Sequence, residues 1–101
     1  ARLPRQLQLG ANFPNPFNPS TTIPFRIPAV AGMQPMPVRL EIFNSLGQRV
    51  RFLVDEARVP GHYRASWDGR DDAGRAIGSG VYLYRLRAGE AIDTGKMMLL
   101  E

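Results

Sequence analysis

Two alternating segments on either side of a glycine- and aspartate-rich stretch constrain the fold of this chain most strongly. Tyr63, Ala65 and Trp67 share one parity, which is typical of a strand with one buried face. Residues 82–88 alternate in the same way. Residues 68–80 supply aspartates for Asx turns and glycines that can take a positive φ, namely Gly69, Gly74, Gly78 and Gly80. The sequence therefore predicts two strands joined by a structured loop.

Other short segments repeat this alternation, and none has a helical period. The residues predicted to face inward are Ile23, Phe25, Ile27, Val38, Leu40, Ile42, Val50, Phe52, Val54, Tyr82, Tyr84 and Leu86. Residues 44–47 form a tight turn and predict a hairpin. Pro24 indicates either an edge strand or a position where its nitrogen faces no partner. Six or seven strands, with turns about every 8 to 12 residues, predict an all-β fold, an antiparallel two-sheet immunoglobulin-like β-sandwich of about seven strands.

Prolines break up the segment over residues 12–22. Pro14, Pro16 and Pro19 have no amide hydrogen to donate to a neighbouring strand, and they push the preceding residues into extended conformations. We expect an ordered arm here, with Phe13 and Phe17 as the anchors that fix it to the core.

The last predicted strand, residues 91–100, ends in an almost unbroken apolar run. A run of this kind suits a strand covered on both faces, or one whose outer face meets a partner. The pattern alone leaves both interpretations open.

Composition and charge exclude several classes of function for this chain. The chain has 101 residues, enough for one domain, and no cysteine, which excludes disulfides and thiolate metal sites. The net charge of +4 comes from scattered arginines, which favours a solvated basic surface over nucleic-acid binding. No apolar run approaches the ~20 residues of a membrane span. Because the sequence begins with Ala1, we expect it to be a segment of a longer protein.

Nothing in the sequence indicates catalysis, and we predict that the domain is not an enzyme and needs no cofactor or metal. His62 has no neighbouring nucleophile or carboxylate. Asp68, Asp71 and Asp72 only superficially match a calcium loop, because Arg70 stands where a ligand is needed. The aromatic residues that a sugar-binding face would use lie on the parity assigned to the core.

Five separated motifs carry a resemblance to a known family. They are NFPNPFNPSTTI (12–23), VRLEIFNSLGQRV (38–50), WDGRDDAG (67–74), GVYLYRL (80–86) and KMMLL (96–100). Together they resemble the C-terminal sorting domain, type A, of cargo proteins of the type IX secretion system. The pattern is also similar to the Ig-like module of the flagellar hook-capping protein. The resemblance implies a sorting domain over residues 9–101, with residues 1–8 as a linker or first edge strand.

The resemblance implies a role as an address label for a larger exported protein. Its partners would be the type IX translocon, a sortase-like peptidase and the cargo domain that precedes it in the same chain. The cargo would reach the cell surface or the medium through the periplasm. The residues to which the resemblance assigns translocon recognition are Gly80, Tyr82, Lys96, Met97, Met98, Leu99 and Leu100. The same sequence permits a hook-capping-type assembly domain, or a passive accessory or carbohydrate-binding module of a secreted glycoside hydrolase.

Overall fold

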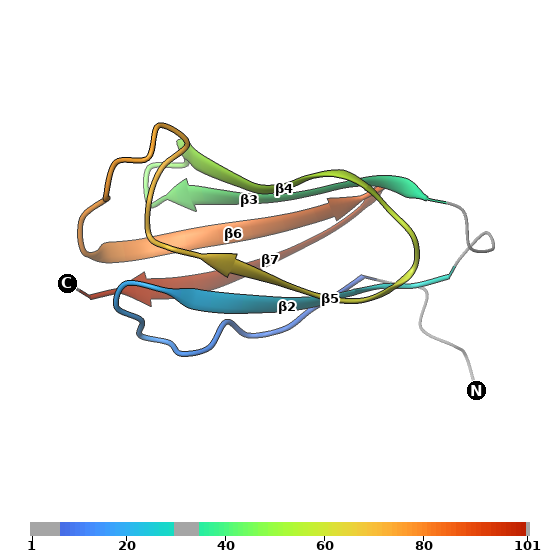
Figure 1. Cartoon of the computed structure of the whole chain (residues 1–101), viewed down its shortest axis with the longest axis horizontal. Coiled ribbons are helices and arrows are strands. Elements are labelled where there is room, and N and C mark those ends of the chain that lie inside the picture. The colour runs from blue at the N-terminus through green and yellow to red at the C-terminus, as the bar shows by residue number, and fades with distance from the viewer. Residues whose placement is uncertain (1–6, 30–34, 101) are drawn as a thin grey trace.

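The chain folds into two antiparallel β-sheets that face each other (Figure 1). The structure is a computed structural model that describes residues 7–29 and 35–100; residues 1–6, part of the expected linker or edge strand, lie outside this range, as do residues 30–34 and 101. The strands are β1 (Gln8–Leu9), β2 (Thr21–Ile27), β3 (Met36–Asn44), β4 (Arg49–Arg58), β5 (Gly61–Trp67), β6 (Gly80–Ala88) and β7 (Ala91–Leu99).

The smaller sheet has the order β1-β2-β5 and the larger one the order β4-β3-β6-β7. The predicted class, an all-β immunoglobulin-like sandwich of about seven strands, is confirmed. Within the described ranges no helix has the length and apolar character needed to cross a membrane.

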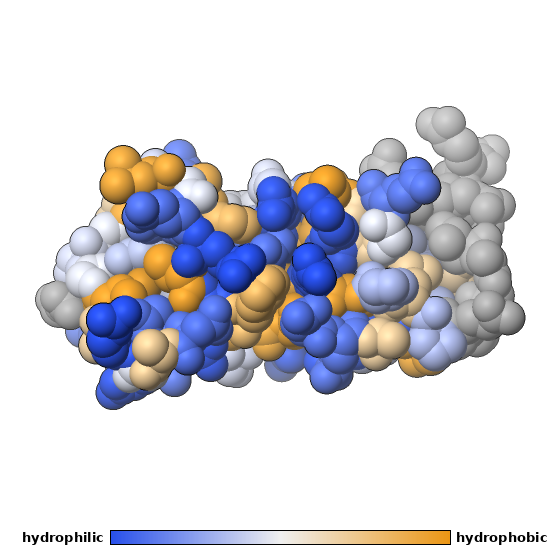
Figure 2. All heavy atoms as spheres, turned by 90° about the horizontal axis from the view of Figure 1, so that it is seen from above, coloured by the Kyte–Doolittle hydropathy of each residue, from blue (hydrophilic) through white to orange (hydrophobic). Residues whose placement is uncertain are grey.

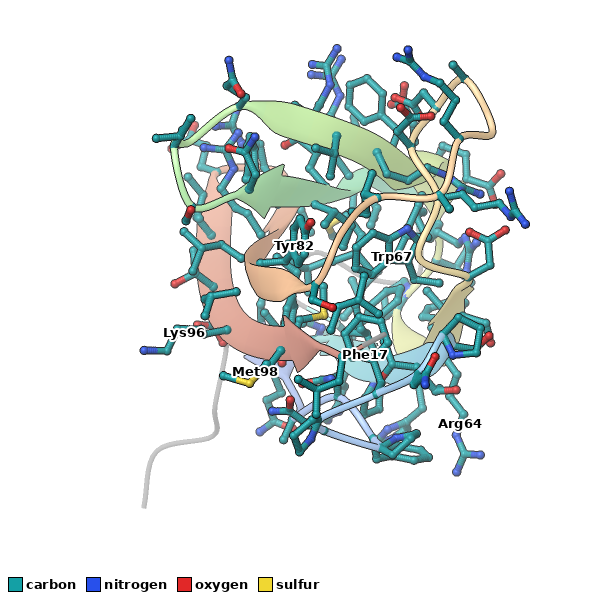
Figure 3. All side chains as sticks on the ribbon, turned by 90° about the vertical axis from the view of Figure 1, so that its left-hand side faces the viewer. Phe17, Arg64, Trp67, Tyr82, Lys96 and Met98 are labelled. Atoms are coloured by element: carbon teal, nitrogen blue, oxygen red, sulfur yellow. The ribbon has the colours of Figure 1, made fainter. Side chains whose placement is uncertain are left out.

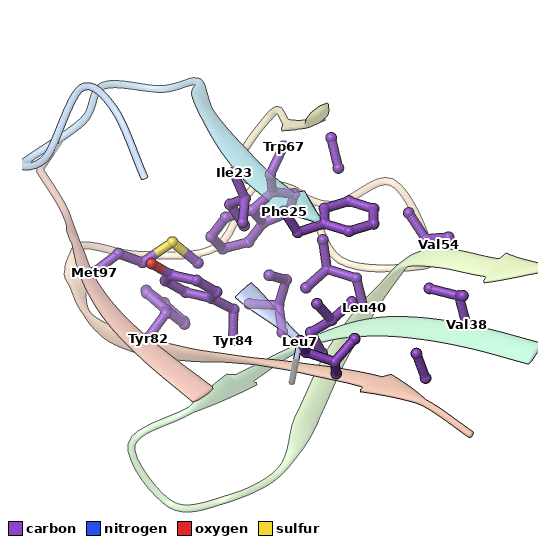
Figure 4. Packing of buried hydrophobic residues seen from close by; sticks show 14 of the residues in the cluster. Leu7, Ile23, Phe25, Val38, Leu40, Val54, Trp67, Tyr82, Tyr84 and Met97 are labelled. Atoms are coloured by element: carbon purple, nitrogen blue, oxygen red, sulfur yellow. The ribbon is translucent and has the colours of Figure 1, made fainter. Parts of the chain in front are cut away.

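The core lies between the two sheets and is built from the predicted parities (Figure 4). Trp67 is fully buried, with its ring centroid 5.5 Å from that of Phe17 and 5.6 Å from that of Tyr82. Its indole Nε1–H donates to the carbonyl oxygen of Arg70 at 2.9 Å. Trp67 therefore joins β5, β6 and the arm at one point, with its polar atom satisfied.

Phe52 does not face the core as predicted. The register between β3 and β4 passes from Leu40↔Val54 to Glu41↔Phe52, so that β4 carries one extra residue. This β-bulge reverses the parity. Leu53 packs against the core instead, and Phe52 lies on the outer face with the Arg49 guanidinium 4.0 Å from its ring centroid.

The arm is anchored by one phenylalanine and not by two. Phe17 is 1% exposed, whereas Phe13 is 48% exposed. The arm pairs with strands on both of its flanks, through Phe13↔Thr22 and Phe17↔Leu99. Backbone pairing at Phe13 turns its side chain outward, so the prediction that Phe13 anchors the arm is wrong.

Pro24 lies in the middle strand of the smaller sheet, so its assignment to an edge strand is wrong. Its carbonyl accepts from the Gly10 amide at 2.8 Å. In an antiparallel pair the Gly10 carbonyl would accept the amide proton that proline lacks. The Tyr84 hydroxyl donates to that carbonyl instead, at 3.1 Å, and accepts from the Asn12 amide at 3.2 Å. A core tyrosine thus compensates for the proline.

The loop between β5 and β6 is structured by its aspartates, as predicted. Asp71 accepts from the backbone amides of Ala73 and Arg75 at 3.0 and 2.9 Å. Asp72 docks the loop on the outer edge of β4, donating from its amide to Val50 at 3.0 Å and accepting from Phe52 at 3.1 Å. Of the four glycines expected to take a positive φ, Gly78 does not. The side that includes β4 and this loop is largely hydrophilic, with separate apolar patches (Figure 2).

Truncating Trp67 tests the junction of β5, β6 and the arm. Trp67→Ala should reduce the free energy of unfolding by about 3 to 5 kcal/mol, because it leaves a cavity among buried rings. Urea unfolding measures the change, with Leu46→Ala, at an 82% exposed position, as a control expected to stay within about 0.5 kcal/mol. Equal unfolding midpoints for the two variants would contradict this assignment of the core.

Removing the Tyr84 hydroxyl tests its bond to Gly10. Burial raises the pKa of Tyr84 above its ordinary value of 10.0, because it disfavours the phenolate. Tyr84→Phe should cost about 1 to 3 kcal/mol at neutral pH, since the partly buried Gly10 carbonyl loses its donor and the buried Asn12 amide loses its acceptor.

The stability that Tyr84 contributes is fully present below pH 10.0 and falls as the pH rises through the raised pKa, because the unfolded chain ionises first. The difference between wild type and Tyr84→Phe should therefore narrow above pH 10.0. Urea unfolding on both sides of this pH measures it, and a constant difference would rule out this pKa effect.

Candidate functional site

The seven residues that the resemblance singled out fall into two groups in the structure. Tyr82, Met97 and Leu99 point into the sandwich and are at most 8% exposed. Lys96, Met98 and Leu100 point outward, and the last two are 41% and 47% exposed. Gly80 is partly buried at the start of β6. Figure 3 shows Tyr82 directed inward, toward Trp67, and Lys96 and Met98 directed away from the core. Only the outward residues are accessible to a partner.

Two further apolar residues join the outward group, and the sequence analysis missed them. Val81 lies opposite Met98 and Leu83 lies opposite Lys96 in the pairing of β6 with β7. They are 37% and 39% exposed. We call these four residues, with Leu100, the C-terminal strand surface. The sequence contains a sign of this surface: Val81 and Leu83 are apolar, although they alternate with the core-facing residues of β6 and should therefore face water.

The arm forms one border of the C-terminal strand surface. The Asn15 Oδ1 atom accepts from the Met98 amide at 3.0 Å, and the Phe17 amide donates to the Met98 carbonyl at 3.0 Å. The Phe17 carbonyl accepts from the Leu100 amide at 2.9 Å. A shallow hollow there is lined by Asn15, Pro16, Val81, Lys96, Met97 and Met98. The arm thus satisfies the edge of β7 and leaves the outward side chains uncovered.

The buried members of the predicted set position this surface. The Tyr82 hydroxyl donates to the Gly78 carbonyl at 2.7 Å, which ties the start of β6 to the preceding loop. Gly95 lies opposite Tyr84, and a Cβ atom there would be 2.3 Å from the tyrosine ring. Glycine at this position lets β7 approach the core closely, just before Lys96 turns outward.

The polar residues beside this surface form ion pairs. On the outer face of the larger sheet, the Glu41 side chain is 6% exposed and accepts from Arg85 at 3.0 Å, with Arg49 at 4.0 Å. The Arg85 guanidinium also lies 4.8 Å from the ring centroid of Phe43. A buried carboxylate held by two guanidiniums is a structural feature of the sheet face.

The carboxylates of the loop are likewise engaged with neighbouring groups. Arg51 lies 3.0 Å from Asp68 and 3.8 Å from Asp72. The pKa of Asp71 is lowered, first because its carboxylate accepts from the Arg75 amide and then because of the Arg75 charge. In residues 7–29 and 35–100, no three of His, Cys, Asp and Glu are grouped so as to hold a metal ion. These contacts account for the loop as a structural element.

The fold and the C-terminal strand surface together define the class of this protein: an Ig-like β-sandwich that exposes apolar side chains on its last two strands. The sequence profile of the FlgD Ig-like domain matches residues 30–91, more than half of the chain. The chain therefore belongs to the FlgD Ig-like domain family. No curated protein matches it significantly.

Solved structures of the same fold include two proteins of Porphyromonas gingivalis. Dimeric latent PorU is 23% identical with a TM-score of 0.72, over 93% of this chain and 9% of PorU. PorZ, described as an essential bacterial surface component of the type IX secretion system, is 20% identical with a TM-score of 0.55, over 90% of this chain and 11% of PorZ.

The fold is also found in an unrelated setting. The alkylpurine DNA glycosylase AlkC of Pseudomonas fluorescens is 17% identical with a TM-score of 0.57, over 95% of this chain and 31% of AlkC. The chain thus spans about a tenth to a third of the length of these proteins. At these identities the likeness shows the fold.

Two neighbouring methionines provide a test of the division between structural and surface residues. Met97→Ala should lower the free energy of unfolding by about 2 to 5 kcal/mol, because Met97 is 2% exposed in the core. Met98→Ala should change it by less than about 0.5 kcal/mol. Urea unfolding of the two variants measures the difference. Similar losses of unfolding free energy would show that the Met98 side chain also contributes to packing.

Proposed function

We propose that this domain is a C-terminal sorting signal that directs a larger exported protein across the outer membrane through the type IX translocon. The cargo domain would precede it in the same chain, and a sortase-like peptidase would act on it at the cell surface. The domain itself would catalyse no reaction, and its location would be the cell surface or the medium.

The observation that carries this proposal is the C-terminal strand surface. The outer faces of β6 and β7 present Val81, Leu83 and Met98 to solvent where a free-standing sandwich would place polar residues. Lys96 adds a single positive charge beside them. An apolar patch with one charge suits a protein partner that reads the end of the chain.

The family and the fold support the same proposal. The five sequence motifs resemble the type A sorting domain, and PorZ, a surface component of the type IX system, contains the same fold. The carbohydrate-binding alternative has less support, because Trp67, Tyr82 and Tyr84 are buried. Assembly of the hook-capping type is compatible with the family, but no surface in the described part of the chain favours it.

A reporter export assay tests the proposal. A reporter with a signal peptide at its N-terminus and these 101 residues at its C-terminus is expressed in a bacterium that has a working type IX system. We expect the reporter at the surface or in the medium, and in the periplasm when the domain is absent. A reporter that stays periplasmic with a folded domain would contradict the sorting role in that host.

Matched variants locate the recognised surface. Met98→Glu and Lys96→Ala should reduce export several-fold without changing the melting temperature, because both side chains point outward. Ile92→Glu is the control, since Ile92 is a 52% exposed residue on the same face of β7 but at its opposite end. If Ile92→Glu reduces export as much as Met98→Glu does, recognition does not depend on the C-terminal strand surface.

A further inference from the structure

A hollow on the outer face of the smaller sheet is unrelated to the C-terminal strand surface. Arg26 lies in register with Gln8 on β1 and His62 on β5. Two residues further along, on the same face, Pro24 pairs with Arg64. Since Phe25 and Ile27 face the core, these side chains face outward. Gln8, Gly10, Pro24, Arg26, His62 and Arg64 all line the hollow. Figure 3 shows Arg64 pointing away from Lys96 and Met98.

The shape of the hollow follows from the residues at its floor. Gly10 has no side chain, and its amide bonds to the Pro24 carbonyl at 2.8 Å. A Cβ atom on Gly10 would lie 2.7 Å from the Pro24 Cγ. The Pro24 ring therefore lies directly against Gly10, and the side chains of Arg26 and Arg64 line the same hollow.

The charge around this hollow is not compensated. Residues 7–29 and 60–67, which include the arm and all of the smaller sheet, contain no Asp or Glu. Six other arginines form ion pairs, but among the described residues Arg26 and Arg64 form none. Arg64 only approaches the ring of Phe13, at 6.0 Å. Because Arg26 and Arg64 are diagonal neighbours on one face, their charges repel each other.

We propose that this hollow binds a phosphate monoester. Such a group carries a charge of about −1.5 to −2 near neutral pH, which balances two guanidiniums. Arginine donates two parallel hydrogen bonds to phosphate oxygens, and the Gln8 amide and the His62 ring supply further donors. An anion between Arg26 and Arg64 converts their repulsion into two attractions. The phosphate is either free in solution or the headgroup of a lipid.

Titration with inorganic phosphate at constant ionic strength tests the site. Amide NMR signals of β2 and β5 should shift with saturation. Arg26→Gln and Arg64→Gln should each weaken binding about tenfold, because each removes a charge-assisted pair. Arg87→Gln is the matched control: it removes the same charge from an exposed arginine on the other sheet, and binding should stay within about twofold. Arg26→Lys keeps the charge and should still weaken binding, because lysine lacks the planar fork.

Vesicles separate the two sources of the phosphate. Co-sedimentation uses phosphatidylcholine vesicles that contain either phosphatidic acid, a monoester, or phosphatidylglycerol, a diester. Saturable shifts with free phosphate that Arg26→Gln weakens support a soluble ligand. Selective sedimentation with phosphatidic acid that Arg26→Gln abolishes supports a headgroup.

Three outcomes overturn the proposal. The first is no saturable shift together with no selective sedimentation. The second is equal weakening by Arg87→Gln, which would indicate diffuse attraction to the basic chain. The third is full binding by both Arg26→Gln and Arg64→Gln. Melting temperatures of all variants confirm that each one is folded.

Discussion

The contact of Trp67 with Phe17 and Tyr82 is the interaction on which the rest of the structure depends. It brings together the last residue of β5, the arm and the start of β6 within ring distances of 5.5 and 5.6 Å. A chain of this size without disulfides must hold its two sheets together mainly by apolar contact between their inner faces. The same contact fixes Phe17, whose backbone pairs with the end of β7, so the core also sets the position of the C-terminal strand surface.

Alternation in the sequence predicted the strands because each sheet buries one face and exposes the other. At a β-bulge, two residues of one strand lie opposite a single residue of the neighbouring strand. Beyond that point, alternation in the sequence no longer shows which side chains face the core. The bulge at Leu53 moves Phe52 from the core to the surface, and no local signal in the hydrophobic pattern marks it. The edge-strand alternative for Pro24 was wrong for a different reason: the donor that proline lacks is replaced by the Tyr84 hydroxyl, 60 residues away in the sequence. Such compensation depends on tertiary contact.

The apolar run at the end of the chain left two interpretations open, and the structure separates them residue by residue. Met97 and Leu99 belong to the core, whereas Met98 and Leu100 are 41% and 47% exposed. The strand is therefore covered on one face only, so the interpretation that both faces are covered is wrong, and an outer face that meets a partner stays a prediction. The part of the site that the sequence did not reveal lies on β6, because recognising Val81 and Leu83 as neighbours of Met98 and Lys96 requires the register of two strands.

The two outer faces of the sandwich differ in how their charge is balanced. On the larger sheet, arginines meet Glu41, Asp55 and the aspartates of the loop, so most of that charge is neutralised within the chain. The smaller sheet has no carboxylate to offer, and its arginines must be neutralised by solvent ions or by a ligand. A sorting domain bound to a partner through β6 and β7 would leave the smaller sheet free. The two proposed sites lie on different sheets, so occupation of one would not block the other.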